Sequence, residues 1–477
     1  MKRDYLYCYI NGVPTEIHGD DIFLPLSEYL RTKLLLVGTK EVCREGDCGA
    51  CSVLVSRSLH KLNKKCDSFR AVNACIFPMF LADASSIVTV ESLSSNLNEV
   101  QNALIEYGGT QCGFCTPGFA VTLSAYFEGV SKKKCSKQNI KNILTGNLCR
   151  CTGYEGIVNA GLSIKGNDTG ILSKKYFSKE IQRNLIEIRK RGICIKGSKG
   201  SFDAPIHLND ACEIKMKTNA RIFGGGTDIG VMLNKGKTII NAEMVLDHID
   251  ELYEMKEENG GLLIGSRVLI EDFRQFIKDK VEDIGNLLNI FASPQIKNVA
   301  TVVGNIANGS PIGDMLPLFY ALDAEIILIS TRGKRKVSLR SFIKGYKSFD
   351  YNPGEFISYL FFRLPHESEL VKCYKISKRR DLDISSVTFG SILKLSKMNI
   401  VEEISLFMGG VGPNIIELVQ AERYILGKNL SSVDLEEVKK KVLNEISPQT
   451  DVRGKKSFRF LLAKNIIQKW YQEIVYE

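Results

Sequence analysis

The sequence predicts a multidomain α+β protein, and three observations carry this prediction: its length, the uneven placement of its cysteines and its changes of hydrophobic period. The chain has 477 residues, which is more than one hydrophobic core usually spans. Eleven of its fourteen cysteines lie before residue 152, so metal chemistry belongs to the N-terminal third. We predict domains over 1–78, 79–163, 198–370 and 371–477, with a linker over 164–197.

The first domain is predicted to be a small β-grasp-like unit. Strands over 5–10 and 15–18 flank Asn11-Gly12, which is a strong hairpin signal. A helix is expected over 26–35, because its leucines recur on one face. Further short strands are expected over 52–55, 69–76 and 87–90.

The second domain is predicted to be a helical bundle. Apolar residues over 97–105 share a helical face, and Gly108-Gly109 closes that helix. Pro117 suits the first turn of the next helix, and Ser136 is expected to cap a third. Residues 164–180 are polar and lack a period, which indicates a linker. The last domain is predicted to be α+β and to end in an amphipathic helix over 458–474.

The composition excludes several classes of function. The net charge is +10, but the basic runs are short and alternate with acidic residues, which is typical of solvated faces, so no nucleic-acid partner is expected. No stretch of 18 uncharged apolar residues exists, so no membrane span is expected. The start of the chain lacks the features of a secretory signal, and we expect a cytoplasmic location. Many cysteines in such a protein indicate metal or redox chemistry rather than disulfides.

The segment CREGDCGAC contains Cys43, Cys48 and Cys51, and Cys75 follows in VNAC. The spacing C-x4-C-x2-C with a distant fourth cysteine is the plant-type pattern for a 2Fe–2S cluster. One short loop must wrap three thiolates around the cluster, and Gly46 and Gly49 permit the positive φ that this wrapping needs. The alternatives are a structural zinc site or simply buried thiols, but zinc sites more often use paired CxxC knuckles.

A second set of four cysteines consists of Cys112 and Cys115 in QCGFCTPG and of Cys149 and Cys151 in LCRCTGY. Their spacing alone fits a four-cysteine zinc site as well as a 2Fe–2S cluster. A second redox centre beside the first would form a relay, whereas zinc does not change oxidation state. The sequence therefore favours a second cluster and leaves zinc open. The other six cysteines show no ligand spacing and are predicted to be buried or inert thiols: Cys8, Cys66, Cys135, Cys194, Cys212 and Cys373.

Two glycine-rich loops stand in the second half of the chain. The segment IFGGGTDIG over 222–230 fails the G-x-G-x-x-G pattern, because Ile229 stands where the third glycine belongs. Its glycines can still present backbone N–H groups to a pyrophosphate, although a tight strand-to-helix turn explains them equally well. The second loop, VATVVGNIANGSPIGD over 299–314, adds side chains that can donate to phosphate or sugar oxygens: Thr301, Asn305, Asn308 and Ser310.

The motifs CREGDCGAC, VNAC, QCGFCTPG and CRCTGY resemble, in this order, those of the xanthine dehydrogenase/oxidase family of molybdenum hydroxylases. The resemblance covers about the first 155 residues. It implies a ferredoxin-like 2Fe–2S domain with ligands Cys43, Cys48, Cys51 and Cys75. It also implies a helical 2Fe–2S-binding domain with ligands Cys112, Cys115, Cys149 and Cys151. In that family the helical-domain cluster lies nearer the molybdenum and the ferredoxin-like cluster nearer the flavin.

Both glycine-rich loops resemble the FAD-binding domain of the same family, which has the vanillyl-alcohol-oxidase-like (PCMH-type) fold. The resemblance implies FAD contacts at Phe223, Gly224, Gly225, Gly226, Thr227, Asp228 and Ile229 in the first loop. It implies contacts at Thr301, Val302, Val303, Gly304 and Asn305 in the second. It adds Phe291, Asp314 and Lys375. Arg379, Arg380 and Asp383 match a charged loop that sets access for the electron acceptor, although the pattern alone indicates an exposed charge run.

The fusion of iron–sulfur and FAD parts in a sequence that ends at Glu477, before any molybdopterin domain, resembles the small subunit of bacterial xanthine dehydrogenases. The resemblance implies a relay in which electrons leave a partner molybdopterin-binding subunit, pass two 2Fe–2S clusters and FAD, and reduce NAD⁺. The assembly is expected to be a dimer of heterodimers. The substrate site then lies in the partner, and no catalytic residue is expected here. Two alternatives are the relay subunit of another molybdenum hydroxylase, acting on an aldehyde, nicotinate or another N-heterocycle, and a partnerless iron–sulfur flavin reductase.

Overall fold

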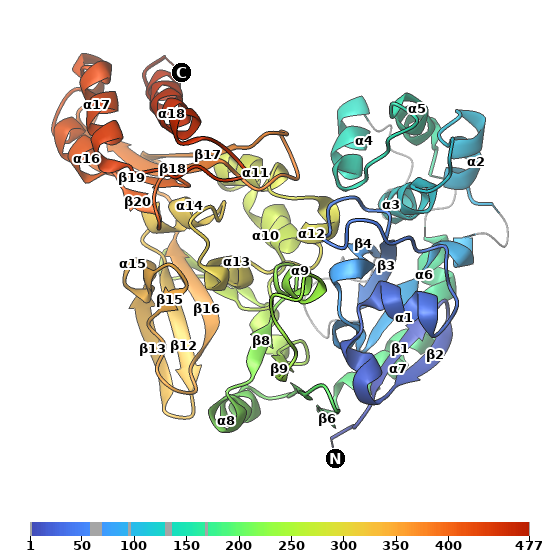
Figure 1. Cartoon of the computed structure of the whole chain (residues 1–477). Coiled ribbons are helices and arrows are strands. Elements are labelled where there is room, and N and C mark those ends of the chain that lie inside the picture. The colour runs from blue at the N-terminus through green and yellow to red at the C-terminus, as the bar shows by residue number, and fades with distance from the viewer. Residues whose placement is uncertain (1, 58–68, 94–96, 129–135, 167–169, 477) are drawn as a thin grey trace. The chain divides into compact units, whose positions relative to one another are not determined.

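The computed structural model describes residues 2–57, 69–93, 97–128, 136–166 and 170–476, which form two compact units (Figure 1). Unit 1 contains Met1–Tyr253 and Ser293–Ala300, and unit 2 contains Glu254–Ala292 and Thr301–Glu477. The boundary between the units therefore falls inside the domain predicted over 198–370. The reason is that this part of the chain adds its first strands, and the short segment 293–300, to the fold of unit 1.

The N-terminal domain is a five-stranded sheet with one helix. Its strands are ordered β2-β1-β5-β3-β4, and β1 pairs in parallel with β5 and antiparallel with β2. The strands are β1 (Leu6–Ile10), β2 (Val13–Ile17), β3 (Ser52–Arg57), β4 (Arg70–Asn73) and β5 (Ser85–Val88), and the helix is α1 (Leu26–Thr32). The predicted hairpin is confirmed, because Asn11 and Gly12 both have positive φ and join β1 to β2. The fold name β-grasp stays a prediction.

Helix α1 ends three residues earlier than the sequence predicts. Leu35 has a φ of 58°, and the Leu36 N–H donates to the Leu30 carbonyl at 2.9 Å. A hydrogen bond between residues six apart, with a left-handed residue between them, is typical of a Schellman motif. Such a motif satisfies backbone carbonyls that have no partner in the last turn of a helix. It directs the chain out of the helix and into the loop that holds the first cysteines.

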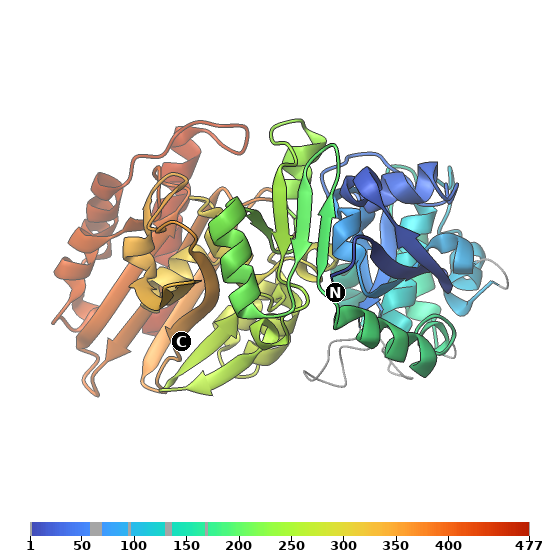
Figure 2. The same ribbon diagram turned by 90° about the horizontal axis from the view of Figure 1, so that it is seen from below.

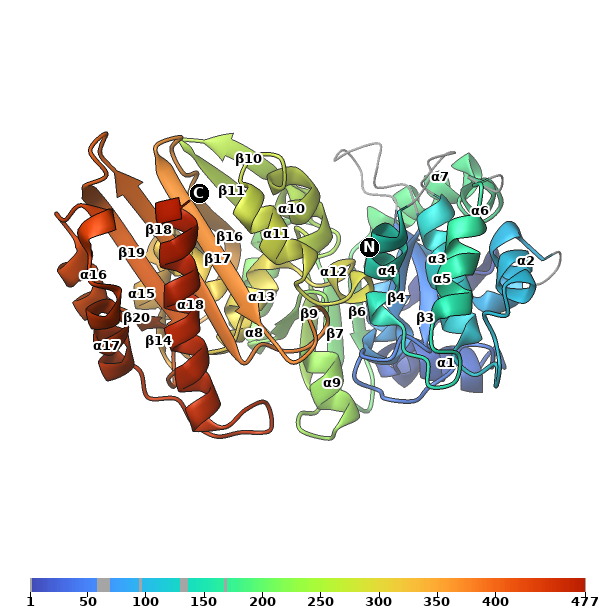
Figure 3. The ribbon, with the colours of Figure 1, turned by 90° about the horizontal axis from the view of Figure 1, so that it is seen from above.

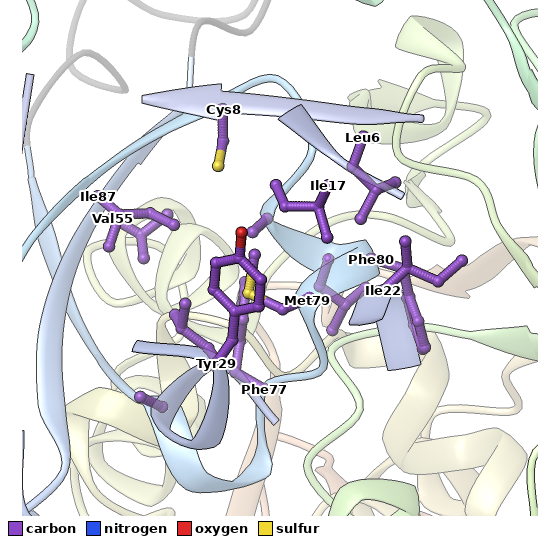
Figure 4. Close-up of a cluster of buried hydrophobic side chains, with 14 of the residues drawn as sticks. Leu6, Cys8, Ile17, Ile22, Tyr29, Val55, Phe77, Met79, Phe80 and Ile87 are labelled. Atoms are coloured by element: carbon purple, nitrogen blue, oxygen red, sulfur yellow. The ribbon is translucent and has the colours of Figure 1, made fainter. Parts of the chain in front are cut away.

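Apolar side chains from the sheet and from α1 form the core of this domain (Figure 4). Leu6 and Cys8 project from β1 and Tyr29 from α1, and all three are buried. Phe80, on η3 (Met79–Ala82), is 1% exposed. Burying side chains of this size contributes about 1.5–3 kcal/mol each. The core therefore holds the sheet and α1 firmly around the cysteine loop.

Among the described residues, the second domain contains the three helices that the sequence predicts and a fourth, α5 (Glu155–Ser163), that it does not. The three predicted helices are α2 (Glu99–Glu106), α3 (Thr116–Glu128) and α4 (Lys137–Ile143). Ser136 caps α4, because its hydroxyl oxygen accepts the Asn139 N–H at 3.1 Å. Phe119, Ile140 and Ile157 pack at the centre of the bundle.

The segment over 164–197 is predicted to be a linker, and that role stays a prediction, but the segment contains regular structure. Two helices lie there, α6 (Ile171–Tyr176) and α7 (Lys179–Arg189). The Glu128 carboxylate accepts the Leu172 and Ser173 N–H groups, at 3.2 and 2.7 Å, and so supplies the acceptors that the start of α6 needs. Tyr176 and Phe177 are buried in a core with Phe69. Long-range contacts of this kind leave no local pattern in the sequence.

The last part of unit 1 is a four-stranded sheet ordered β6-β7-β9-β8. Its strands are β6 (Ile193–Lys196), β7 (Ser201–Ala204), β8 (Arg221–Phe223) and β9 (Ala242–Val245). Helix α8 (Leu208–Thr218) joins β7 to β8, and α9 (Ile229–Asn234) follows β8. Phe202 on β7 and Phe223 on β8 pack against Phe80 of the N-terminal domain, with ring centroids 5.0 and 4.9 Å from that of Phe80. This sheet therefore shares its core with the iron–sulfur part.

Unit 2 begins with an antiparallel sheet ordered β10-β11-β16-β12-β13, whose strands run side by side from yellow-green to orange in Figure 2. The strands are β10 (Met255–Glu258), β11 (Gly261–Gly265), β12 (Glu325–Ser330), β13 (Gly333–Ser338) and β16 (Phe356–Arg363). The helices of this part are α10 (Ile270–Ile277), α11 (Glu282–Asn289), α13 (Val302–Asn308), α14 (Leu316–Ala321) and α15 (Leu339–Phe342), and β14 (Ile343–Gly345) pairs with β15 (Ser348–Phe349). Phe273, Phe319 and Phe362 form its aromatic core.

The C-terminal domain is a second sheet of unit 2, ordered β17-β18-β19-β20 and covered by helices (Figure 3). Its strands are β17 (Glu369–Ile376), β18 (Val387–Leu395), β19 (Val401–Gly409) and β20 (Ile416–Glu417). Its helices are α16 (Val419–Ile425), α17 (Leu435–Glu445) and α18 (Lys456–Tyr476). The predicted C-terminal helix is confirmed, and Trp470 on α18 is fully buried against Phe389 of β18. Within the described ranges, no helix has both the length and the apolarity to cross a bilayer.

A buried ion pair ties the first residues of the chain to the rest of unit 1. Asp83 accepts two hydrogen bonds from the Arg3 guanidinium, at 2.9 and 2.8 Å, and lies 3.0 Å from Nε2 of His248. Burial raises the pKa of Asp83, but the hydrogen bonds from Arg3 and His248 outweigh burial and bring this pKa well below its ordinary value.

This pair predicts how unit 1 responds to acid. Because the pKa of Asp83 is lower in the folded state, its carboxylate stabilises the fold above the unfolded-state pKa of about 3.9, and that stabilisation is lost as the pH falls through the folded-state pKa. We expect Asp83→Asn to lower the melting temperature at pH 7 and the difference from wild type to shrink toward pH 3. Thermal unfolding at several pH values measures this. The control is Asp4→Asn, at an exposed position. A difference that stays constant from pH 7 to pH 3 would contradict the prediction.

Candidate cofactor sites

The first group of cysteines comes from two places in the N-terminal domain. Cys43, Cys48 and Cys51 lie in the loop between α1 and β3, and Cys75 lies on a single 3-10 turn, η2 (Ala74–Ile76). The strand predicted over 69–76 ends at Asn73, so Cys75 follows the strand instead of lying on it. The sulfurs of this group interact with one another, Cys43 with Cys48 and Cys75, and Cys75 with Cys51. These contacts lower the pKa of Cys43 and raise the pKa of Cys75.

The backbone of this loop has the conformation that the sequence predicts. Gly46 and Gly49 have φ values of 77° and 68°, and Arg44, which the sequence did not single out, has a φ of 54°. The Glu45 N–H points at the Cys43 sulfur, 3.4 Å away. Backbone N–H groups aimed at thiolate sulfurs offset negative charge, as a bound cluster requires.

Two asparagines that the sequence analysis did not select support the loop. The Asn73 amide donates to the Gly46 carbonyl at 2.7 Å. The Asn234 amide donates to the carbonyls of Arg44 and Cys75, at 2.9 and 2.8 Å, and so joins the loop to the 3-10 turn. Asn73 stands in the VNAC motif and could have been found there. Asn234 lies far along the chain at the end of α9, and no local pattern marks it.

The second group lies in the helical domain. Cys112 and Cys115 precede α3, and Cys149 and Cys151 precede α5. The sulfur of Cys115 interacts with that of Cys149, and the sulfur of Cys112 with that of Cys151. Each contact therefore pairs one cysteine of the CxxC segment with one of the CxC segment. Burial, together with the contact to Cys149, raises the pKa of Cys115 to about 12.

Thr152 lowers the pKa of one of these cysteines, Cys149. Its backbone N–H and its hydroxyl both donate to the Cys149 sulfur, at 3.4 and 3.1 Å. Burial raises the pKa of Cys149, but the hydrogen bonds from Thr152, together with those from Cys115 and the Cys151 backbone, outweigh burial, and the net effect is a lower pKa. A lower pKa favours the thiolate, which is the form that binds a metal.

The donor set in both groups fits binuclear clusters. A 2Fe–2S cluster takes four thiolates, two on each iron, so its ligands approach one another in pairs. The second group shows two such pairs, and in the first group the four sulfurs form a continuous series of contacts.

The two groups differ in exposure. Cys51 and Cys75 are buried, whereas Cys112 and Cys151 are exposed. Phe114, beside Cys115 in sequence, is 47% exposed. Of the other cysteines, Cys8, Cys212 and Cys373 are buried as predicted, and Cys194 is partly exposed. Cys66 and Cys135 lie outside the described residues.

The first glycine-rich loop lies in unit 1, where strand β8 turns into helix α9. Gly225 must be glycine, because a Cβ there would lie 1.9 Å from the Val299 carbonyl oxygen, and Gly226 has a φ of 72°. The residues of the predicted FAD contact are the end of β8, the turn and the first residue of α9: Phe223, Gly224, Gly225, Gly226, Thr227, Asp228 and Ile229. Phe223 is fully buried, so its side chain belongs to the core and only its backbone remains for a ligand.

The second loop lies in unit 2. Thr301 is the N-cap of α13, and its hydroxyl oxygen accepts the Gly304 N–H at 3.0 Å. The side-chain carbonyl oxygen of Asn305 is buried, and among the described residues it has no hydrogen-bond partner. A buried acceptor without a donor costs free energy, and a ligand hydroxyl or N–H would satisfy it. Of the remaining predicted contacts, Val302 and Val303 are buried in α13.

The structure brings together three predicted contacts that are far apart in sequence. Lys375 on β17 forms a buried ion pair with Asp314, with 2.6 Å between Nζ and Oδ2. The Ser385 hydroxyl donates to the other Asp314 oxygen, also at 2.6 Å. Lys375 Nζ lies 5.7 Å from the ring centroid of Phe291. A buried ammonium next to an aromatic ring fits an anionic or carbonyl-bearing ring system such as a flavin.

The loop over 377–385 is exposed. Arg379 binds Asp383 through its side chain and through its backbone N–H, which donates at 3.0 Å. This pairing lowers the pKa of Asp383. Arg380 is exposed as well. An exposed charged loop agrees with the pattern-based interpretation, and a role in acceptor access stays a prediction.

Three protein-family models match consecutive parts of the chain. Residues 89–162 match a 2Fe–2S binding domain, 199–366 match a FAD binding domain in molybdopterin dehydrogenase, and 372–474 match a CO dehydrogenase flavoprotein C-terminal domain. Consecutive parts of the chain are therefore similar to a 2Fe–2S binding domain, to a FAD binding domain in molybdopterin dehydrogenase and to a CO dehydrogenase flavoprotein domain.

Curated relatives agree with these domains. The chain is 29% identical to xanthine dehydrogenase from Emericella nidulans over 90% of its length, and 27% identical to aldehyde oxidase 2 from Rattus norvegicus over all of it. It covers 35% and 39% of these proteins, respectively. The chain thus spans between a third and two-fifths of the length of these relatives.

Solved structures share the fold of about half of the chain. A chain of the Cu,Mo-CO dehydrogenase has 22% identity and a TM-score of 0.53, and the match covers 56% of this chain and 94% of that one. A chain of quinoline 2-oxidoreductase from Pseudomonas putida 86 has 21% identity and a TM-score of 0.52, with coverage of 57% and 94%. At these identities the likeness concerns the fold alone.

Proposed function

We propose that this chain is the electron-transfer subunit of a xanthine dehydrogenase, which carries electrons from a partner molybdopterin subunit through two 2Fe–2S clusters and FAD to NAD⁺. The observation that carries the proposal is the gathering of eight cysteines into two groups of four within unit 1. The matches to a 2Fe–2S binding domain and to a FAD binding domain in molybdopterin dehydrogenase support it.

The proposed ligands are Cys43, Cys48, Cys51 and Cys75 for one cluster and Cys112, Cys115, Cys149 and Cys151 for the other. Within the first group, the chain shields Cys51 and Cys75 from water, whereas Cys43 and Cys48 are partly exposed. Within the second, Thr152 donates two hydrogen bonds to the Cys149 sulfur, which favours the thiolate form. When bound, such clusters pass single electrons and FAD collects them in pairs.

We propose that FAD contacts both glycine-rich loops together with Phe291, Asp314 and Lys375. Gly225 and Gly226 supply a turn that only glycine allows, with backbone N–H groups for a pyrophosphate. Asn305 supplies a buried acceptor that needs a donor. Lys375, held by Asp314 at 2.6 Å, supplies a positive charge beside the Phe291 ring.

The proposed partner is a molybdopterin-binding subunit that holds the substrate site, in a dimer of heterodimers in the cytoplasm. The exposure of Cys112 and Cys151 supports an approach of this partner to the helical domain, since electrons must enter where a redox centre is close to the surface. Phe114, half exposed beside this group, offers apolar area for such a contact.

A relay subunit of an aldehyde-oxidising enzyme is the second candidate. The likeness to aldehyde oxidase 2, at 27% identity over the whole chain, is nearly as strong as that to xanthine dehydrogenases. The substrate pocket of such an enzyme lies in its molybdopterin part, so these residues do not separate the two candidates.

Affinity purification of the chain from the organism that makes it tests both proposals. We expect a complex with a molybdopterin-binding subunit that contains iron, flavin and molybdenum and reduces NAD⁺ when xanthine is added. NAD⁺-independent oxidation of aldehydes, with xanthine inactive, would support the second candidate instead. A colourless protein that contains zinc and releases no flavin on heating would contradict the whole proposal.

A further inference from the structure

A single buried glutamine touches the segments that carry both cysteine groups. Gln295 lies on α12 (Pro294–Lys297), which packs against β4 in unit 1 (Figure 1). Its side chain is fully buried. Its amide nitrogen has two hydrogens and lies within hydrogen-bond distance of three oxygens: Oδ1 of Asn147 at 2.9 Å, the Thr122 hydroxyl at 3.2 Å and the Ser52 hydroxyl at 3.5 Å.

Each of these partners belongs to a segment that carries predicted cluster ligands. Ser52 directly follows Cys51 in the chain, and Asn147 stands two residues before Cys149. Thr122 lies on α3, the helix that starts after Cys115. One amide group therefore joins the loop of the first cysteine group to both loops of the second.

The two cysteine loops are also bonded directly to each other. The Leu148 N–H donates to the Cys48 carbonyl at 2.9 Å, and the Asn147 amide donates to the Gly49 carbonyl at 3.2 Å. Cys48 is a proposed ligand of the first cluster, and Leu148 is the residue before Cys149, a proposed ligand of the second. The backbone hydrogen bond between Leu148 and Cys48 therefore links the two sets of ligands almost directly.

Three glycines let this junction close. A Cβ on Gly49 would lie 2.2 Å from the Gly146 carbonyl oxygen, and one on Gly118 would lie 2.3 Å from the Gly49 carbonyl oxygen. A Cβ on Gly146 would lie 2.0 Å from Oε1 of Gln295. Backbone from both loops thus meets around the Gln295 side chain with no room for a methyl group.

The direction of the hydrogen bonds requires a donor at position 295. Gly49 offers a carbonyl, so the Asn147 amide nitrogen must face it, and the Asn147 oxygen must then face Gln295. A residue without an N–H at position 295 leaves the buried Asn147 oxygen without a donor, which costs about 1–3 kcal/mol.

We infer that Gln295 is a positioning residue that holds the two cysteine loops at one fixed separation, and so sets the spacing of the two clusters. This inference rests on the proposed function, because it concerns clusters that the function requires. It goes beyond that function in assigning the spacing to a residue that stands in sequence between two predicted FAD contacts, Phe291 and Thr301, and not in either iron–sulfur domain.

The test compares Gln295→Met with wild type in the full chain. Methionine keeps the length of the side chain and removes the donor. We expect unchanged iron content, loss of the magnetic splitting between the two reduced clusters in electron paramagnetic resonance spectra, and loss of hydrogen-exchange protection at the Leu148 amide. Asn147→Leu should give the same two losses. The control is Gln275→Met, since Gln275 is exposed on α10 and bonds only to Glu271 among its described neighbours.

The outcomes separate this inference from the proposed function. Wild-type protein without iron refutes the proposed function, while hydrogen exchange at Leu148 still tests the junction in that protein. Wild type with two coupled clusters, and Gln295→Met with the same splitting and the same protection, overturns the inference alone. Loss of a cluster from Gln295→Met also overturns it, because the residue would then be needed for binding and not for spacing.

Discussion

Replacing Cys43 with alanine is expected to halve the iron content of the purified protein and to leave the second cluster intact. Cys43 is the sulfur that contacts both Cys48 and Cys75, so its loss opens the first group at its centre. The second group lies in a separate domain with its own hydrophobic core and should keep its iron. Iron and acid-labile sulfide analysis, with visible absorbance, measures the result.

The matched control is Cys194→Ala. Cys194 is a partly exposed cysteine on β6 that shows no ligand spacing, so its replacement should leave iron and absorbance unchanged. Equal iron in wild type and Cys43→Ala would show that Cys43 is no ligand. Complete loss of iron from Cys43→Ala would show that the two groups do not bind independently.

Replacing Lys375 with methionine is expected to destabilise unit 2 by about 3 kcal/mol, because it leaves the Asp314 carboxylate buried without its charge partner. The variant should also lose flavin, since the same ammonium lies beside the Phe291 ring. Urea unfolding and the ratio of flavin to protein absorbance measure the two effects.

Lys336→Met is the control for Lys375→Met. Lys336 pairs with Glu325 in the same unit at 2.8 Å, but both side chains are exposed, so its loss should cost no more than about 0.5 kcal/mol. The double variant with Asp314→Asn should recover part of the stability, because the unpaired charge is then gone. Normal flavin content in Lys375→Met would exclude Lys375 from the flavin site.

Sequence patterns predicted the features of this protein that depend only on residues close together in the chain. The Asn11-Gly12 hairpin, the Ser136 cap and the positive φ at Gly46 and Gly49 all follow from the conformations that these residues favour. The cysteine spacing found both sets of ligand candidates, because one short loop must supply several sulfurs. The binding roles themselves remain predictions.

The features that the sequence analysis missed depend on contacts between distant segments. Helix α6 starts where Glu128 supplies acceptors, and Asn234 holds the first cysteine loop from the far end of α9. The residues next to Gln295, Ser293 and Pro294 among them, give no indication that its side chain is buried or functional. Its partners at Ser52, Thr122 and Asn147 are more than 140 residues away, and no periodicity or motif connects them.

The return of Ser293–Ala300 to unit 1 makes both halves of this protein discontinuous. A fragment that stops at Tyr253 would contain all eight proposed ligands but would lack the eight residues that fill the interior beside them. Limited proteolysis or split expression at that boundary should therefore yield an N-terminal piece that is prone to aggregation, whereas adding back a peptide of 293–300 should help it fold. Genes for stand-alone iron–sulfur modules derived from this chain would need a substitute for that peptide.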